Sequence, residues 1–516
     1  MQAASPLPVE TPADGSSEYL IFRTKSPSRR GFLLPFHGRR QVLPYCHGAV
    51  RAGKRFWLVL NTMLNGISSR SPFLANALVG CALFALSLAV FWFYYGAARE
   101  VYGSGALNDF YKFYLSSRNV LTGGQSYWMP PDKARKCQNQ SLPQPAMGGD
   151  HGPRAPMRIE EIIHPNLNPP TMVMLVMPLA YLSYEDAWIL FCMVSLACAG
   201  LAWWQVLKSR AFPGLASSRR AILTVLVFLA YFPSYANFEY GQVAFLLMLP
   251  MTLSWFALRM GKDRLSGLYL GLLVGLKPFF VFFFLPILCA GRWSVLVSAL
   301  AGLVIAVSCS GGLLGFQHYS DYLAVLGKVS WFSSSWNASF FGFYTKLFGG
   351  AEGNAWFDAP VLSSCLIFLS SMMVVLVVAR LVWRARLLGV SRPELADRLF
   401  LLSTPSMLLL SPLGWMYYFP LLAVPVLIFI RCISQSPHRR IYGLLLILSL
   451  MLSGVPSFLI SSCAIKTLGD VLWRHSLPFY SLVGFFVLAV AVSYGGFQAE
   501  GSRSLTNVSR QSMKRG

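Results

Sequence analysis

Apolar stretches recur along most of the chain, and the charged residues lie mainly in the gaps between them. Many of these stretches approach the roughly twenty residues that an α-helix needs to cross a bilayer. Basic clusters fall in every second gap, while Asp, His, Asn, Gln, Trp and Tyr concentrate in the gaps between those. Because Lys and Arg favour cytoplasmic loops, the alternation predicts an all-α polytopic integral membrane protein. Its chemically capable residues are expected on the far side of the membrane.

The pattern predicts about twelve transmembrane helices, with both termini in the cytoplasm. They cover residues 73–97 and about 186–207, 221–237, 242–260, 265–290, 293–313, 360–384, 397–411, 416–431, 441–462 and 478–496. The stretch 265–290 supplies two of them, because Arg264 and Arg292 place both of its flanks in the cytoplasm. Two short helices must then meet near Lys277-Pro278. Non-helical backbone at that depth needs a cavity or packed protein around it.

Two further helices are predicted in the long outer loop 98–185. Phe110–Leu121 begins directly after Asp109. Thr171–Leu182 is apolar, but at about twelve residues it is too short to cross a bilayer. If it crossed, the basic residues between 208 and 220 would lie outside, against the charge rule. We therefore expect a re-entrant or surface-lying helix there.

Composition places the membrane region, residues 73–497, between two basic cytoplasmic tails, residues 1–72 and 498–516. The first tail is rich in Pro, Ser, Gly and Arg, and we expect it to be largely disordered. Only 12% of the chain is charged, about half the share in a soluble domain. The net charge of +23 comes largely from the tails and short loops. Orientation in the membrane explains it, so no nucleic-acid partner is expected.

Asp109 is the first candidate for chemistry, at the start of the outer helix. One interpretation is an N-cap, because an Asp side chain can bond the free N–H groups of a helix start. The other is a general base just above the membrane, which would take a proton from an acceptor hydroxyl. The sequence leaves both open.

Lys277 is the second candidate. An ammonium at membrane depth is costly and usually serves a function, and a lysine beside a cavity suits a phosphate. The alternative is that the side chain snorkels to the interface.

The remaining candidates lie in the other outer turns and loops. Gln242 follows a very short turn, His318 begins a large loop with Asp321, and Asn337 lies beside Trp336. Trp415 ends the turn Ser411–Trp415. Indole and amide groups suit sugar binding, although interfacial Trp is common and a lone His is more often structural. No metal-ligand spacing or nucleotide-binding motif is present, so neither a metal nor a cofactor is expected.

The order of these motifs resembles the polyprenol-phosphate-mannose-dependent mannosyltransferases of glycosyltransferase family 87 (DUF2029), in the GT-C class. The resemblance runs from about Asn108 to Tyr418. It rests on Asp109-Phe110, Leu121–Tyr127, Asn168–Pro170, Pro178-Leu179, Tyr240–Gln242, the glycines at 267, 271 and 275 before Lys277-Pro278, Trp336–Ser339 and Ser411–Trp415. The segment 129–158 and the N-terminal tail depart from the family pattern.

The resemblance implies a GT-C-type fold whose outer-face loops carry the site. It implies inverting sugar transfer from a polyprenyl-phosphate donor to a glycan or glycolipid acceptor. Asp109 would be the base, Lys277 would meet the donor phosphate, and Gln242, His318, Asn337 and Trp415 would bind substrate. Mannose follows from the resemblance only. The expected location is the bacterial inner (plasma) membrane, with the site facing the periplasm or exterior.

A transporter or lipid flippase for a glycolipid or polyprenyl-linked substrate is the alternative, because broken helices near the midplane also occur in transporters. We find no inverted repeat, and the polar candidates gather on one side only. An alternating-access protein should present comparable polar residues to both sides. These two observations favour the transferase.

Overall fold

The computed structural model describes residues 72–104, 108–124, 126–127, 165–209, 211–215, 217–329, 332–349, 357–434, 436–454 and 476–513. The chain divides into two compact units, Met1–Ala77 and Leu78–Gly516. In the first unit the described residues are 72–77, which begin a helix. The predicted disorder of the N-terminal tail and the segment 129–158 lie outside the described residues.

Helices make up most of the described residues, and the β-structure among them is a single bridge between Asn337 and Trp415. The α-helices are α2 (Pro72–Ser104), α3 (Phe110–Leu121), α4 (Pro170–Val176), α5 (Tyr184–Lys208), α6 (Ser218–Ala230), α7 (Phe232–Glu239), α8 (Ala244–Arg259), α9 (Asp263–Leu276), α10 (Phe284–Cys289), α11 (Trp293–Leu314), α12 (Gln317–Leu326), α13 (Phe340–Phe348), α14 (Pro360–Leu387), α15 (Arg392–Leu410), α16 (Ala423–Ser434), α17 (Arg439–Gly454) and α20 (Leu477–Met513). The 3₁₀ helices are η2 (Met177–Tyr181), η3 (Pro213–Leu215), η4 (Pro278–Phe283) and η5 (Met416–Leu422). The predicted all-α class is confirmed for the described residues.

Six described helices are long and apolar enough to cross a membrane, and a seventh span results if the bent pair α6–α7 counts as one. This agrees with a polytopic membrane protein, but the predicted twelve crossings are not confirmed. The difference arises because several apolar stretches form short or broken helices. For example, α8 has 16 residues, which at 1.5 Å per residue gives about 24 Å, against a bilayer core of about 30 Å. Helices α6 and α7 meet at an angle of 61°.

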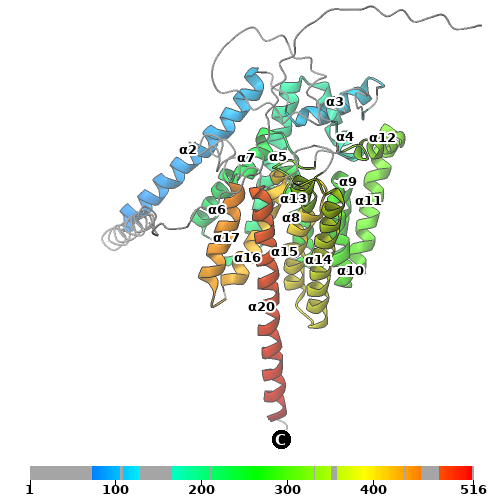
Figure 1. Ribbon diagram of the computed structural model, residues 1–516. Helices are drawn as coiled ribbons and strands as arrows, with labels where there is room; N and C mark the ends of the chain where they lie inside the picture. Colours follow the sequence, from blue (N-terminus) through cyan, green and yellow to red (C-terminus); the bar gives the residue numbers. More distant parts are fainter. Residues whose placement is uncertain are drawn as a thin grey trace, which may run out of the picture. The chain divides into compact units, whose positions relative to one another are not determined.

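Two short helices follow the sequence prediction closely. Helix α3 covers Phe110–Leu121 as predicted. The apolar stretch after Pro169 forms α4 and η2, which together are too short to count among the candidate spans. Helix α4 packs against α3, α9 and α11, and these elements lie together near one end of the helices in Figure 1. The predicted short helix is thus present, held by protein contacts, and whether it is re-entrant or lies on the surface stays a prediction.

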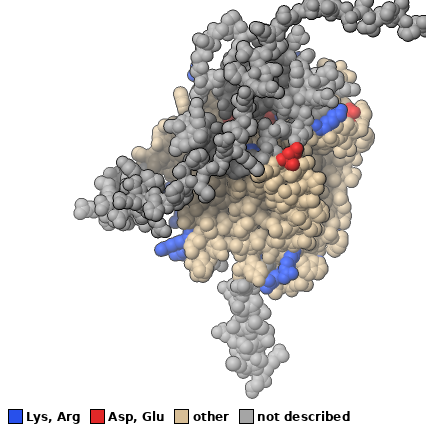
Figure 2. Space-filling view, in the orientation of Figure 1, with Lys and Arg blue, Asp and Glu red and all other residues tan. Residues whose placement is uncertain are grey.

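The helices have two polar ends. Gln242 lies just before α8, where it contacts Asp109, and Arg259 ends the same helix, where it contacts Asp397. We call these the Asp109 end and the Asp397 end. Figure 2 shows a broad uncharged surface between basic side chains below and mixed charges above.

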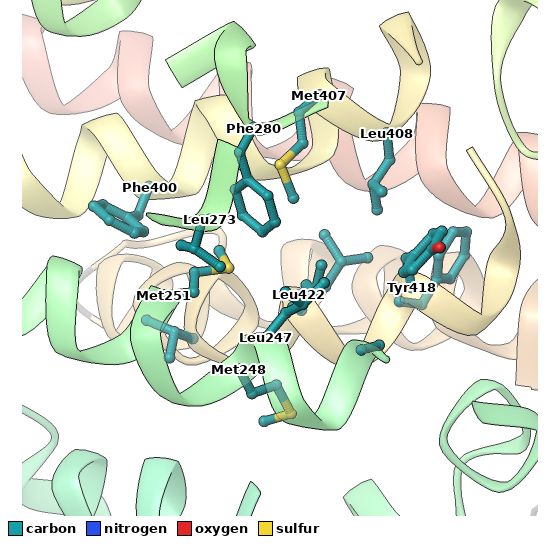
Figure 3. Packing of buried hydrophobic residues seen from close by; sticks show 14 of the residues in the cluster. Leu247, Met248, Met251, Leu273, Phe280, Phe400, Met407, Leu408, Tyr418 and Leu422 are labelled. Atoms are coloured by element: carbon teal, nitrogen blue, oxygen red, sulfur yellow. The ribbon is translucent and has the colours of Figure 1, made fainter. Parts of the chain in front are cut away.

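A densely packed apolar core joins the central helices. Its residues come from α8, α9, η4, α15 and η5, and Figure 3 shows them interdigitating. Phe280 and Leu273 are fully buried, and Met407 of α15 lies beside Phe280. Because interiors packed in this way resist rearrangement, the core fixes where η4 and η5 begin. These starts carry Lys277 and Trp415.

Helix α9 approaches α11 closely through glycines. A Cβ atom at Gly271 would lie 2.0 Å from the backbone oxygen of Ala299, and one at Gly267 would lie 2.2 Å from that of Val295. Small residues at such spacing allow two membrane helices to approach. The glycines before Lys277 therefore hold α9 against α11, which fixes the position at which α9 ends.

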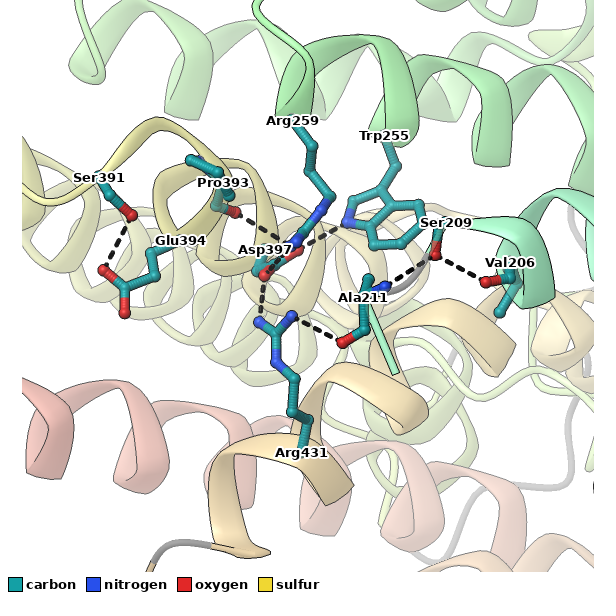
Figure 4. A network of polar contacts seen from close by, with 10 residues as sticks. All are labelled: Val206, Ser209, Ala211, Trp255, Arg259, Ser391, Pro393, Glu394, Asp397 and Arg431. Atoms are coloured by element: carbon teal, nitrogen blue, oxygen red, sulfur yellow. Dashed lines mark hydrogen bonds and ion pairs between the residues drawn. The ribbon is translucent and has the colours of Figure 1, made fainter. Parts of the chain in front are cut away.

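Asp397, a residue that the sequence analysis did not single out, joins three helices at the Asp397 end. Its buried carboxylate pairs with Arg259 of α8 and Arg431 of α16, and it accepts a hydrogen bond from Trp255 Nε1 at 2.8 Å. Figure 4 shows the two guanidinium groups converging on this carboxylate. Arg431 also donates to the carbonyl of Ala211. A single carboxylate thus ties α8, α15 and α16 together.

Replacing Asp397 by Ala should strongly destabilise the protein, because both arginines would lose their partner. Removing one member of a buried ion pair costs about 3–5 kcal/mol. We expect about 3 kcal/mol here, since the arginine side chains are 16% and 26% exposed. The control is Glu394→Ala on the same helix, where an exposed carboxylate accepts a hydrogen bond from Ser391 and the loss should stay below about 1 kcal/mol. Equal losses in unfolding experiments in detergent would contradict this role.

Candidate active site

Asp109 precedes α3, and its side chain does not cap that helix. No side-chain capping bond forms from Asp109. Instead, Asn108 Oδ1 accepts from the backbone N–H of Phe110 at 3.0 Å. Asn108 also bonds the hydroxyl of Tyr184 and the carbonyl of Glu239. The neighbouring residue therefore fixes the start of α3, and the Asp109 carboxylate is left for other contacts.

The Asp109 carboxylate contacts two nitrogen donors, the amide of Gln242 and the ammonium of Lys112. Gln242 Nε2 donates to Oδ2 at 2.6 Å, and Lys112 Nζ pairs with Oδ1 at 2.5 Å. Gln242 is 5% exposed, whereas the Asp109 and Lys112 side chains are 26% and 20% exposed. The structure thus brings together two predicted site residues, Asp109 and Gln242. Lys112 is an addition that the sequence analysis did not single out.

The turn Tyr240–Gln242 has to be glycine-centred to reach Asp109. Gly241 has φ +60°, and a Cβ atom there would lie 2.6 Å from Cβ of Phe110. The backbone N–H of Gln242 donates to the carbonyl of Asn237 at 2.8 Å. Glycine therefore lets the turn press against the residue next to Asp109, and the Gln242 side chain is held in place.

Lys277 lies where α9 ends, as the sequence predicted. Its backbone is extended (φ −145°, ψ 106°), and the 3₁₀ helix η4 begins at Pro278. The side chain is only 9% exposed, with Nζ 5.2 Å from the ring centre of Tyr418. It is thus buried against an aromatic face and does not extend to the surface.

The Lys277 ammonium feels the charges of Asp109 and Lys112. The Asp109 carboxylate is close enough to stabilise the ammonium, and Lys112 is close enough to oppose it. Among the described residues, the Lys277 ammonium has no carboxylate or hydrogen-bond partner. A buried cation without an anion is costly, so the position is suited to receive one.

Trp415 is the first of three aromatic residues in successive ring contact, and the last of them, Tyr418, lies against Lys277. The Trp415 and Tyr417 rings stack at 6.0 Å, and Tyr417 meets Tyr418 at 5.0 Å. Tyr418 in turn contacts Phe279 at 5.1 Å. Trp415 is partly buried against the core. The predicted residue is therefore connected to Lys277 through two tyrosines.

Asn337 is fully buried, and its amide is used within the protein. Nδ2 donates to the carbonyls of Phe332 and Pro412, and Oδ1 accepts from the N–H groups of Ser339 and Gly414. The bridge to Trp415 lies at the same place. Asn337 thus fastens the turn that contains it to the turn 411–415, and its amide has no remaining group to offer a sugar.

His318 lies on α12 in a separate cluster. Nδ1 bonds Ser126 Oγ at 2.8 Å and lies 4.0 Å from Asp321 Oδ2. The adjacent Tyr127 donates to the carbonyl of Asn168 at 2.5 Å and packs on Tyr322. No contact among the described residues joins His318 to Asp109, Gln242 or Lys277. The structure gives it a role in holding residues 126–127 against α12.

Burial keeps the tyrosines of this second cluster neutral. It raises the pKa of Tyr127 well above its usual value, with smaller contributions from Tyr322, Tyr319 and Asp321. Burial likewise raises the pKa of Tyr322. Both phenols therefore remain hydrogen-bond donors at any physiological pH. Neither tyrosine can therefore act as a base in this cluster.

Comparison with known proteins agrees with the predicted resemblance. The sequence model of Glycosyltransferase family 87 matches residues 166–412. A curated relative from Mycolicibacterium smegmatis is 26% identical over 302 residues, which is 57% of this chain and 68% of the relative. That relative is named polyprenol-phosphate-mannose-dependent alpha-(1-2)-phosphatidylinositol pentamannoside mannosyltransferase. No solved structure gives a significant match.

The matched region contains Gln242, Lys277, His318 and Asn337 but neither Asp109 nor Trp415. For Asp109, the link to the family region is therefore its hydrogen bond with Gln242. The resemblance predicted from the motifs is confirmed, and the protein is a membrane-embedded glycosyltransferase whose residues 166–412 carry the family 87 match.

Proposed function

We propose that the protein transfers mannose from a polyprenyl-phosphate donor to a glycan or glycolipid acceptor, with inversion at the anomeric carbon. The observation that carries this proposal is that the Asp109 carboxylate lies within electrostatic range of the buried Lys277 ammonium, which has no carboxylate or hydrogen-bond partner among the described residues. Such a pair can accept a proton and stabilise a phosphate. The name of the M. smegmatis relative supports the same donor and a glycolipid acceptor.

The proposed reaction is a single displacement. The acceptor hydroxyl oxygen attacks the anomeric carbon from the face opposite the phosphate. The bond from that carbon to the phosphate oxygen breaks, and its electron pair leaves with the phosphate. Asp109 takes the hydroxyl proton. The products are an inverted glycoside and polyprenyl phosphate, and the proton passes from Asp109 to the phosphate or to water.

Lys277 stabilises the charge that develops on the departing phosphate. A positively charged group that is already in position before the reaction stabilises developing negative charge best in a site from which water is excluded. Lys277 is such a group, because its side chain is buried. The lipid tail would lie along the apolar surface near the short helices α9 and α10. Asp109 and Lys277 thus serve opposite ends of the displacement.

The other predicted residues act around this pair. Gln242 orients the Asp109 carboxylate, and Trp415 is a partly exposed residue against which a sugar can pack. Asn337 acts indirectly, by holding the turn that carries Trp415. His318 positions the segment 126–127. In these proposals, Gln242, His318 and Asn337 are positioning residues.

We further propose that the Asp109 end faces the periplasm or exterior of a bacterial inner membrane, with both termini in the cytoplasm. The basic residues at the Asp397 end support this orientation, since Arg259 and Arg431 lie there. A polyprenyl-phosphate sugar would then be used on the side away from nucleotide sugars.

Mass spectrometry of a strain that lacks the gene tests the proposal in the cell. The lipid-phosphate sugar should accumulate, and one glycan or glycolipid should lack a sugar. The wild-type gene should reverse both changes, and a gene encoding Asp109→Asn should reverse neither. A substrate retained inside the cell, with a normal donor pool, would contradict the proposal and indicate transport.

A further inference from the structure

Each oxygen of the Asp109 carboxylate has one donor in the structure. Gln242 occupies Oδ2, and Lys112 occupies Oδ1. A base accepts a proton through a free oxygen lone pair that faces the hydroxyl, and ion pairing lowers the basicity of a carboxylate. Withdrawal of one of the two donors would therefore raise the basicity of Asp109 and open more of its surface to a hydroxyl.

Lys112 is the donor that can withdraw. Gln242 is 5% exposed and follows a glycine turn that presses on Phe110, so its side chain has little freedom. The Lys112 side chain is 20% exposed and flexible, and it lies one helical turn from Asp109 on α3. Partly exposed ion pairs of this kind are weak, with a worth of about 0–1 kcal/mol. Lys112 can therefore exchange Asp109 for a stronger anionic partner.

The charges around Asp109 indicate what that partner is. Lys112 and Lys277 both lie within electrostatic range of the one carboxylate, and they oppose each other. Two ammonium groups and one carboxylate leave an excess of one positive charge. A phosphodiester carries one negative charge, so a donor phosphate bound at Lys277 would balance the group.

We propose that Lys112 is a latch that links donor binding to the activation of Asp109. Without donor, Lys112 covers Oδ1. When the donor phosphate binds at Lys277, Lys112 turns to the phosphate and uncovers Oδ1 for the acceptor hydroxyl. The donor must then bind before the acceptor. This inference rests on the proposed function and adds Lys112 as a second cation at the phosphate.

Chemical cross-linking tests the latch directly. A carbodiimide joins a lysine to a carboxylate in contact with it, with loss of one water, and peptide mass spectrometry would locate the Asp109–Lys112 amide. The purified full-length protein should form this amide without ligand. Saturating polyprenyl phosphate should lower the yield about fivefold or more, the lower end of the usual coupling between two binding events. An unchanged yield with polyprenyl phosphate demonstrably bound would overturn the proposal.

Steady-state kinetics provide the second readout. Lys112→Met should raise the KM for the donor about tenfold to a hundredfold, as expected for one lost hydrogen bond to a charged group. Lys112→Arg keeps the charge and should recover part of the affinity. The control is Arg118→Met, which removes a cation from the same helix but leaves Asp109 untouched, and it should leave the KM unchanged. A purely structural Lys112 would lower folded yield without a selective change in the donor KM.

The two proposals fail in different ways. If wild-type protein transfers no sugar from a lipid phosphate, the proposed function is wrong. If wild-type protein transfers sugar but Lys112→Met has a normal donor KM, the latch alone is wrong. Should Lys112→Met fail to fold, the cross-link in wild-type protein still decides.

Discussion

Sugar transfer by the Asp109→Asn variant should fall about a hundredfold to ten-thousandfold, the usual contribution of a general base. An amide cannot take the acceptor proton at neutral pH. The variant should fold normally, because Asn108 and not Asp109 bonds the start of α3. The measurement is kcat for transfer from synthetic polyprenyl-phosphate mannose by purified protein, with donor binding measured separately.

The control for this prediction is Asp186→Asn, which changes an exposed carboxylate at the start of α5. It should transfer sugar at the wild-type rate. Near wild-type turnover by Asp109→Asn would remove Asp109 from the mechanism. Glu239 would then be the next carboxylate to test, because its backbone carbonyl already contacts Asn108 beside Asp109.

The Lys277→Met variant should lose about a hundredfold to a thousandfold in kcat/KM for the sugar donor. This is the usual effect of removing one preorganised group that stabilises charge in the transition state. Lys277→Arg should keep partial activity, because the charge remains while the shape of the head group changes. Stability should not fall in Lys277→Met, since Met fills a similar volume and removes a buried cation that lacks a partner among the described residues.

Activity and stability together separate the possible roles of Lys277. A catalytic role predicts lost transfer with an unchanged or higher unfolding temperature. A packing role predicts the reverse, namely a lower unfolding temperature with normal kcat/KM in the folded fraction. Normal transfer by Lys277→Met would therefore show that the donor phosphate lies elsewhere.

The sequence predicted local features well where a short pattern determines them. Helix α3 starts after Asp109, and the break at Lys277 follows from a Lys-Pro pair between two basic flanks. The number of crossings could not be predicted in the same way. Apolar composition does not reveal that the predicted span 416–431 begins with the 3₁₀ helix η5, or that the chain bends sharply between α6 and α7. These features depend on packing between distant segments.

Site residues were predictable by type but not by partner. Asp109 and Gln242 stand out in their own loops, yet 133 positions separate the two residues that share a hydrogen bond. Lys112 could have been noticed, since residues three apart on a helix are neighbours. Tyr418 and Asp397 gave no such signal, because an aromatic or acidic residue in an apolar stretch acquires its role only from what packs against it.

The most direct test of the account is the donor requirement of the purified protein. Wild-type protein in liposomes is given an acceptor glycolipid and either polyprenyl-phosphate mannose or a nucleotide-linked mannose. The account predicts transfer from the lipid phosphate alone, with release of polyprenyl phosphate and inverted configuration in the product. Transfer from the nucleotide sugar, or a product that retains the donor configuration, would contradict it.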